Sequence, residues 1–266
     1  MNQQSNMPTV LCFSGLDPTG GAGIQADIET IASMGAHPAP VVTALTVQDT
    51  SSVKRFESVD SLLLVEQART VLEDMPIAAI KIGMLANRAI IEAIHSILVD
   101  YPDIPVVLDP VLKGGGGGDL LASDALDALL ELLVPQTTIL TPNSIEARVL
   151  AKDADSLPAC AESLLDKGCD YVLITGGHES TEGIVNTLYS NHRELEQTEW
   201  TRLPHEYHGS GCTLASAITA MLALGIDPVT ATHEAQTFTW EALKSANRMG
   251  MGQFIPNRLF WAREED

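Results

Sequence analysis

Residues 9–34 read TVLCFSGLDPTGGAGIQADIETIASM, and this stretch decides the fold class. Residues 9–14 form an apolar run of strand length. A glycine-rich turn follows, and then Ile24, Ile28 and Ile31 recur at helical spacing, which indicates a helix with one apolar face. A buried strand that passes through a turn into a helix is the typical opening unit of a sheet with parallel strands.

The same alternation of strand and helix continues along the chain. Apolar runs predict further strands at residues 40–47, 78–84, 105–111, 137–141 and 171–175. Helical spacing predicts helices at residues 61–73, 88–99, 124–133, from about 144, 158–167, 211–224 and 228–247. Residues 183–190 and 194–202 predict a hairpin that turns near Asn191 and His192. We therefore expect a mostly parallel sheet with helices on both faces.

No linker or repeat interrupts this pattern, so we expect one domain at residues 9–249. We expect residues 1–8 to be a disordered tail. Residues 250–266 have a mixed character that predicts no particular element, and we expect them to pack on the domain or follow it.

Composition restricts the possible partners. The formal net charge is −20, from 15 Lys and Arg against 35 Asp and Glu, so the surface repels nucleic acids and anionic membranes. A phosphate-binding site in such a chain must depend on local backbone N–H groups, a helix start and a divalent cation. No signal segment and no apolar run of about 18 residues is present, and the four cysteines form no C-x-x-C pair. We expect a reduced, cytoplasmic protein, with His205 and His208 as loop histidines in water rather than metal ligands.

The candidate site residues follow the predicted strands. Ligands of parallel α/β sheets bind beyond the carboxyl ends of the strands. Polar or glycine-rich segments occupy these places at residues 14–23, 47–49, 84, 109–118, 143–146 and 175–178. Their coincidence predicts an active site at this edge of the sheet.

The glycine-rich segment at 15–23 has several possible interpretations. A P-loop would need lysine where Gly21 stands, so that motif is excluded. The letters of a dinucleotide fingerprint occur at Gly21, Gly23 and Ala26, but residues 16–20 separate them from the strand. Two interpretations remain: a turn that allows close packing of strand and helix, and a ligand loop in which Asp17 and backbone amides meet a substrate.

Residues 209–213, GSGCT, directly precede an apolar helix. Two glycines allow the backbone amides to turn inward, and a helix start carries about half a positive charge, so the segment predicts a binding nest for a phosphoryl group. A cysteine in the first helical turn should have a lowered pKa, which predicts an accessible thiolate at Cys212. The alternative is a helix capped by Ser210 beside an ordinary buried cysteine.

Two carboxylates and one amide also follow predicted strands. Asp109 and Glu146 could hold Mg²⁺, which prefers oxygen ligands. Alternatively, Asp109 is a turn residue before proline and Glu146 is an acid at a helix start. Gln48 offers a donor and an acceptor, which match the edge of an aminopyrimidine, although a loop glutamine is usually solvated. Met84 could equally be core filler.

Seven segments in this order resemble one known family. They are SGLDPTGGAGIQADIET, VVTALTVQDT, IKIGML, VVLDPVL, LTPNSIEA, ITGGH and HGSGCTLASAI, and the resemblance runs from about residue 10 to residue 243. Together they resemble the hydroxymethylpyrimidine/phosphomethylpyrimidine kinases of thiamine biosynthesis, in the ribokinase-like superfamily.

The resemblance implies a ribokinase-like three-layer α/β/α sandwich without a separate lid domain. It implies phosphorylation of 4-amino-5-hydroxymethyl-2-methylpyrimidine by ATP with Mg²⁺, followed by phosphorylation of the monophosphate, and it implies a homodimer. Two alternatives remain: a pyridoxal or pyridoxine kinase of the same fold, and a non-catalytic sensor of pyrimidine phosphates.

The resemblance also implies roles for individual residues. Cys212 matches the catalytic base, and Gly209, Ser210 and Gly211 match the anion hole. The residues that match the pyrimidine-binding positions are Gly15, Asp17, Gln48 and Met84. The residues that match the ATP-binding and Mg²⁺-binding positions are Asp109, Lys113, Asn143, Glu146 and Thr175, with Asp109 and Glu146 holding the metal through water.

This chain departs from the family pattern at two of these positions. Five glycines, 114–118, follow Lys113 where the family often has Lys-Ser-Gly, so we expect a more flexible loop. Thr175 stands where the family commonly has lysine, so we expect Mg²⁺ and the helix start to carry more of the phosphate binding.

Overall fold

The computed structural model describes residues 7–114, 120–121 and 124–262. The expected disordered tail at 1–8 and the expected flexible run at 114–118 therefore lie almost entirely outside the described residues. Pro8, which belongs to the described part, is held at the sheet, because its carbonyl oxygen accepts a hydrogen bond from the backbone N–H of His37.

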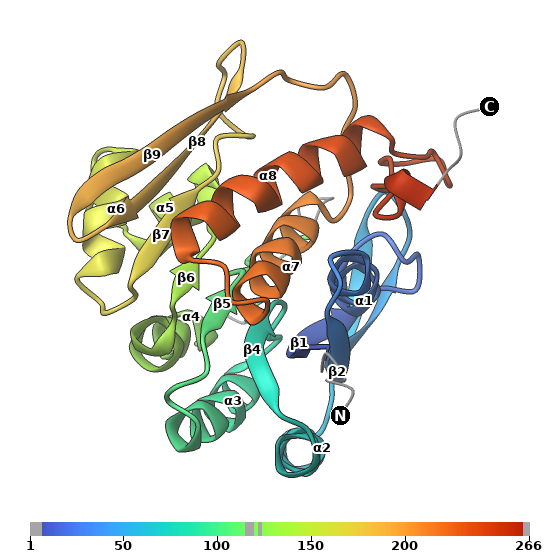
Figure 1. Ribbon diagram of the computed structural model, residues 1–266, viewed down its shortest axis with the longest axis vertical. Coiled ribbons are helices and arrows are strands. Elements are labelled where there is room, and N and C mark those ends of the chain that lie inside the picture. Colours follow the sequence, from blue (N-terminus) through green and yellow to red (C-terminus); the bar gives the residue numbers. More distant parts are fainter. Residues whose placement is uncertain (1–6, 115–119, 122–123, 263–266) are drawn as a thin grey trace, which may run out of the picture.

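The described strands form one nine-stranded sheet in the order β3-β2-β1-β4-β5-β6-β7-β8-β9 (Figure 1). The strands are β1 (Thr9–Leu16), β2 (His37–Gln48), β3 (Val53–Ser58), β4 (Ile77–Ile82), β5 (Val106–Leu108), β6 (Ile139–Leu140), β7 (Tyr171–Ile174), β8 (Ile184–Ser190) and β9 (Arg193–Trp200). Neighbours from β2 through β7 pair in parallel, and β3, β8 and β9 add antiparallel pairings at the two edges. The predicted mostly parallel sheet is confirmed.

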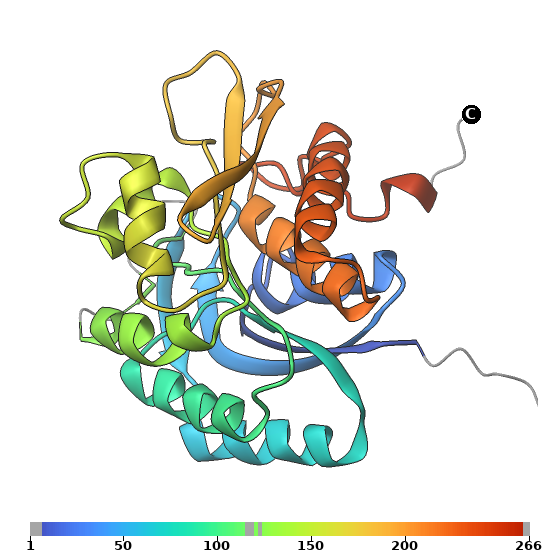
Figure 2. The same cartoon turned by 60° about the vertical axis from the view of Figure 1, so that its left-hand side comes forward.

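Helices cover both faces of this sheet, as Figure 2 shows. They are α1 (Gly23–Ser33), α2 (Ser61–Asp74), α3 (Arg88–Asp100), α4 (Ala125–Ala128), α5 (Ser144–Leu150), α6 (Leu157–Leu165), α7 (Ser210–Ala223) and α8 (Pro228–Lys244). Alternate residues of β1 face opposite layers: Leu11 and Phe13 join the core under α2 to α6, whereas Val10 and Cys12 pack against α1. Val107 of β5 packs with α7 and α8 in the same way. The architecture is thus a three-layer α/β/α sandwich.

Several local predictions need correction. The strand β3 was missed because its sequence, VKRFES, has only two apolar residues, Val53 and Phe56, which are partly buried and do not alternate with period two. The predicted helix at 124–133 is helical in α4 only to Ala128 and continues as a π-helical turn, Leu129–Leu133. The predicted β8–β9 hairpin is confirmed: Asn191 and His192 have φ angles of 50° and 56°, the left-handed pair that a tight hairpin turn requires.

The residues after α8 pack back on the domain. The backbone N–H of Phe254 donates to the carbonyl of Glu206, and Phe254 in turn accepts from the N–H of His208. Arg258 is fully buried, and its guanidinium donates to the Gly21 carbonyl and to Glu29. Within the described chain, no helix combines the length and the apolar character needed to cross a membrane.

A buried ion pair lies beneath the carboxyl ends of the strands. The Lys81 ammonium of β4 is fully buried, 2.9 Å from Asp27 Oδ1 of α1. Lys81 also donates to Ser14 Oγ of β1 at 2.9 Å, and Asp27 accepts from Ser216 of α7 at 2.7 Å. Burial lowers the pKa of Lys81, but the attractions of Asp27, Cys212 and Asp109 together raise it by more, so Lys81 remains charged.

Replacing Lys81 by methionine should lower the free energy of unfolding by about 3–5 kcal/mol, because it leaves the Asp27 carboxylate buried without its counter-ion. Urea denaturation measures this change. Arg88→Met is the matched control: it removes an exposed ion pair with Glu92 and should cost less than about 0.5 kcal/mol. Equal small effects of the two substitutions would show that the buried pair does not support the fold.

Candidate active site

One cavity of about 250 Å³ opens at the carboxyl ends of the parallel strands, beside the start of α7. Every residue predicted for the site lines it: Gly15, Asp17, Gln48, Met84, Asp109, Lys113, Asn143, Glu146, Thr175, Gly209, Ser210, Gly211 and Cys212. The structure thus brings together all of the predicted positions from seven segments of the chain.

The start of α7 forms one wall of the cavity. Gly209 is its N-cap, with a φ angle of 81° and no side-chain cap. A Cβ on Gly209 would lie 1.9 Å from the Gly21 carbonyl oxygen, so this close approach requires glycine. The alternative in which Ser210 caps the helix is wrong, because Ser210 is the first helical residue. The first backbone N–H groups of α7 have no partner within the helix and can bind an anion.

Cys212 lies in this first turn, but the structure contradicts the prediction that its thiol has a lowered pKa. Burial raises the pKa of the Cys212 thiol to about 12, although the Lys81 ammonium opposes this shift. Asp109 and Asp27 raise it further. The prediction of a lowered pKa considered only the helix start, and desolvation outweighs that effect. Cys212 is therefore a neutral thiol at pH 7.

Alkylation of Cys212 by iodoacetamide should be slow at pH 7 and should rise about tenfold per pH unit up to about pH 10, because only the thiolate reacts. Peptide mass spectrometry distinguishes Cys212 from the buried cysteines Cys12, Cys160 and Cys169. N-acetylcysteine is the control, and its rate should level off near pH 9. A plateau for Cys212 below pH 8 would contradict the raised pKa.

Asp109 and Glu146 line the same cavity, and Asp109 lies beside the start of α7. Burial raises the pKa of both carboxyls, and the Asp109 charge raises that of Glu146 further. A hydrogen bond from the Cys212 thiol partly offsets the shift at Asp109. Glu146 and Asn143 also form a capping box at the start of α5: Glu146 Oε2 accepts from the Asn143 N–H at 2.9 Å, and Asn143 Oδ1 accepts from the Glu146 N–H at 3.0 Å.

These carboxylates fit a divalent cation. Asp109 Oδ2 is buried and has no hydrogen-bond partner, and it lies 3.8 Å from the position of a Cβ on Gly211. A bare carboxylate beside an anion-binding helix start would repel phosphate, and a bound cation removes this conflict. Among the described residues no group of three or more His, Cys, Asp or Glu surrounds one metal position. Water and phosphate oxygens would therefore complete the shell, as is usual for Mg²⁺.

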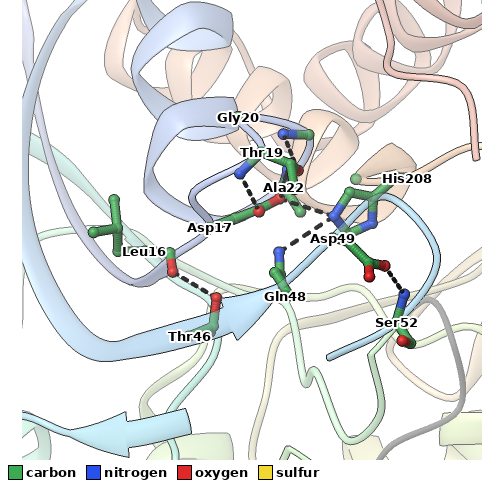
Figure 3. Close-up of polar contacts among 12 residues, drawn as sticks. Leu16, Asp17, Thr19, Gly20, Ala22, Thr46, Gln48, Asp49, Ser52 and His208 are labelled. Atoms are coloured by element: carbon green, nitrogen blue, oxygen red, sulfur yellow. Dashed lines mark hydrogen bonds and ion pairs between the residues drawn. The ribbon is translucent and has the colours of Figure 1, made fainter. Parts of the chain in front are cut away.

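A hydrogen-bond network forms the wall on the β1–β2 side (Figure 3). His208 Nε2 lies 2.8 Å from Asp17 Oδ2, and Gln48 Nε2 lies 3.4 Å from His208 Nε2. The expectation that His208 is a loop histidine in water is wrong, since only 8% of its surface is exposed. His205, in contrast, is exposed and stacks on Phe254 at 4.0 Å between ring centroids. The sequence feature that could have indicated a buried His208 is its position directly before residues 209–213, the predicted phosphoryl-binding segment.

Apolar residues complete this side of the cavity. Met84 packs over Gly15, where an added Cβ would lie 2.7 Å from the Met84 sulfur. Val53 of the missed strand β3 and Leu120 pack with Met84. His178, which also lines the cavity, lies in the predicted segment 175–178, whereas sequence reasoning singled out none of the further lining residues Val53, Leu120, Tyr207 and Gln253.

Solved structures share this architecture. Pyridoxal kinase from Staphylococcus aureus, solved with AMP-PCP and pyridoxal, has a TM-score of 0.86 at 27% sequence identity, covering 97% of this chain and 96% of that one. Phosphomethylpyrimidine kinase from Clostridium difficile has a TM-score of 0.76 at 34% identity, covering 89% and 99%. The fold is that of the ribokinase-like small-molecule kinases.

Sequence comparison narrows this class. The family described as phosphomethylpyrimidine kinase matches residues 17–257. The hydroxymethylpyrimidine/phosphomethylpyrimidine kinase of Mycobacterium tuberculosis is 39% identical over 260 residues, which cover 95% of this chain and 94% of that protein. The chain belongs to the phosphomethylpyrimidine kinase family, and the resemblance noted from its sequence is confirmed.

Proposed function

We propose that this protein uses ATP to phosphorylate the hydroxymethyl group of 4-amino-5-hydroxymethyl-2-methylpyrimidine and then phosphorylates the monophosphate to the pyrophosphate, a reaction of thiamine biosynthesis in the cytoplasm. The observation that carries the proposal is the position of the α7 start. It lines the same cavity as Gln48 and Met84, which we assign to the acceptor wall, and as Asp109 and Glu146, which we assign to the nucleotide wall. A phosphoryl group passing between the two walls meets the backbone amides of residues 210–212.

The α7 start acts on the transferring group. Its backbone N–H groups and the positive end of the helix stabilise negative charge on the phosphoryl oxygens in the transition state. In the loose transition state of phosphoryl transfer the acceptor proton leaves late, so a thiolate is not needed beforehand. The Cys212 sulfur accepts a hydrogen bond from the acceptor hydroxyl. As that proton passes to the sulfur, the thiol hydrogen passes to the Asp109 carboxylate, so Cys212 is a neutral thiol before and after the transfer.

The wall that contains Asp109 and Glu146 binds the nucleotide. These two carboxylates would hold Mg²⁺ through water, and Lys113, Asn143 and Thr175, which line the same cavity, would contact ATP. Bound Mg²⁺ supplies positive charge that neutralises the β- and γ-phosphates. The protein residues orient this charge toward the anion hole of α7.

Incubation with Mg·ATP and the hydroxymethylpyrimidine should yield products with one and with two added phosphoryl groups, identified by mass spectrometry.

Cys212→Ala should lower kcat by about 10²-fold or more with little change in nucleotide affinity. Cys160→Ala, in the distant helix α6, is the control. Near-full turnover of the Cys212 variant would exclude Cys212 from the proton transfer, and absence of any wild-type product would exclude the proposed reaction.

A second candidate function is the phosphorylation of pyridoxal or pyridoxine, which is favoured by the fold shared with the Staphylococcus aureus kinase solved with pyridoxal. Competition between the two acceptors distinguishes the functions. A non-catalytic pyrimidine-phosphate sensor would consume no ATP when the pyrimidine is added.

We also propose a homodimer that buries an apolar patch formed by Leu16, Leu45 and Val47. Leu45 and Val47 point to the same face of β2 and are 50% and 45% exposed. Leu16 of β1 is the register partner of Leu45 and is 38% exposed. Adjacent exposed aliphatic side chains are typical of a protein–protein interface.

The double variant Leu45→Glu/Val47→Glu should therefore be a monomer, because it places two charges in the buried interface. Size-exclusion chromatography with light scattering measures the mass. Leu62→Glu, on α2 and 66% exposed, is the matched control and should leave the dimer intact. A monomeric wild-type protein, or a dimer that survives the double substitution, would contradict this interface.

A further inference from the structure

The Asp17 carboxylate is fully engaged by the protein. Its Oδ1 accepts from the Thr19 N–H at 2.8 Å. Its Oδ2 accepts from the Ala22 N–H at 2.8 Å and the Thr19 hydroxyl at 2.9 Å, and it lies 2.8 Å from His208 Nε2. A carboxylate has about four acceptor positions, so these contacts leave at most one, on Oδ1, and the Gln48 amide is the protein donor beside it. Its function must be exerted through its protein neighbours.

His208 is fixed in place from three sides. Its backbone N–H donates to the Phe254 carbonyl at 2.9 Å. Its ring lies against Gly21, where an added Cβ would be 2.3 Å from His208 Cδ2. Burial raises the pKa of Asp17, but hydrogen bonds from His208, Gln48 and Thr19 lower it by more, so the carboxylate is ionised. His208 Nε2 therefore carries the hydrogen and donates it to Asp17.

This arrangement fixes the orientation of the Gln48 amide. Its Nε2 lies 3.4 Å from His208 Nε2, and two N–H donors cannot bond to each other. The amide nitrogen instead donates to the Asp17 carboxylate, which is one of the bonds that lower the pKa of Asp17. With one N–H engaged in this way, Gln48 keeps its carbonyl oxygen and its second N–H, side by side, for a ligand in the cavity it lines.

A donor beside an acceptor matches only one of the two candidate rings. A ring nitrogen next to an exocyclic amino group, as in a 4-aminopyrimidine, forms a bidentate pair with such an amide, as adenine does with Asn or Gln. The pyridoxine ring nitrogen has a methyl group and a hydrogen beside it and offers no such pair. Resting on the proposed function, we infer that Asp17 and His208 are positioning residues that orient Gln48 and thereby favour an aminopyrimidine over pyridoxine as the acceptor.

The test measures kcat/KM for hydroxymethylpyrimidine and for pyridoxine in the wild type and in the variants His208→Phe and Asp17→Asn. The phenyl ring of the first variant keeps the packing against Gly21 but donates no hydrogen bond, and the side-chain amide of the second carries no charge. Each variant should lower the ratio of the pyrimidine value to the pyridoxine value about tenfold or more, mainly through KM for the pyrimidine. Thermal melting establishes that each variant is folded.

Two controls make the result specific. His205→Phe changes an exposed histidine outside the cavity and should leave the ratio unchanged. Gln48→Leu removes the amide itself and should lower the ratio as far as the positioning variants do, or further. An unchanged ratio in both positioning variants, or an equal loss for both acceptors, would overturn the inference while the proposed function stands. A wild type that phosphorylates neither acceptor would overturn the proposed function as well.

Discussion

The buried pair between Lys81 and Asp27 is the constraint on which the site depends. It joins β4 to α1, and the hydroxyls of Ser14 and Ser216 extend it to β1 and α7. These four elements supply the glycine-rich loop, the strand end near Met84 and the helix start with Cys212. Because an unpaired charge is costly at full burial, the pair keeps these elements in one relative position. The distance from the anion hole to the acceptor wall follows from it.

The alternation of strand and helix could be predicted because parallel strands buried on both faces require long apolar runs. The lengths of the individual strands and helices could not be predicted in this way. The run at 105–111 predicts a long strand, yet β5 ends at Leu108, because Asp109 turns to the cavity and Pro110 has no N–H for the ladder. The strand β3 could not be predicted because it lies at an exposed edge of the sheet. It pairs through its backbone there, and its side chains need no alternating apolar pattern.

The site positions could be predicted because carboxyl ends of parallel strands meet at one edge, so residues far apart in sequence line one cavity. The protonation states of these residues could not be predicted from the sequence, because a protonation state depends on burial in the folded protein. His208 directly precedes the glycine nest in the sequence, but only the fold places it beside Asp17, and only the fold places Lys81 beside Asp27. The prediction for Cys212 failed for the same reason: the helix start is visible in the sequence, but the desolvation that outweighs it is not.

A neutral thiol at position 212 suits a cavity that already contains two buried carboxyls. The pKa values of Asp109 and Glu146 are raised by burial and, at Glu146, by the neighbouring charge of Asp109. An aspartate in place of Cys212 would be a third carboxylate and would add repulsion toward phosphate in a chain of net charge −20. In the proposed mechanism the thiol accepts a hydrogen bond from the acceptor hydroxyl without adding charge. The start of α7 would then meet the phosphoryl group with its positive end uncompensated.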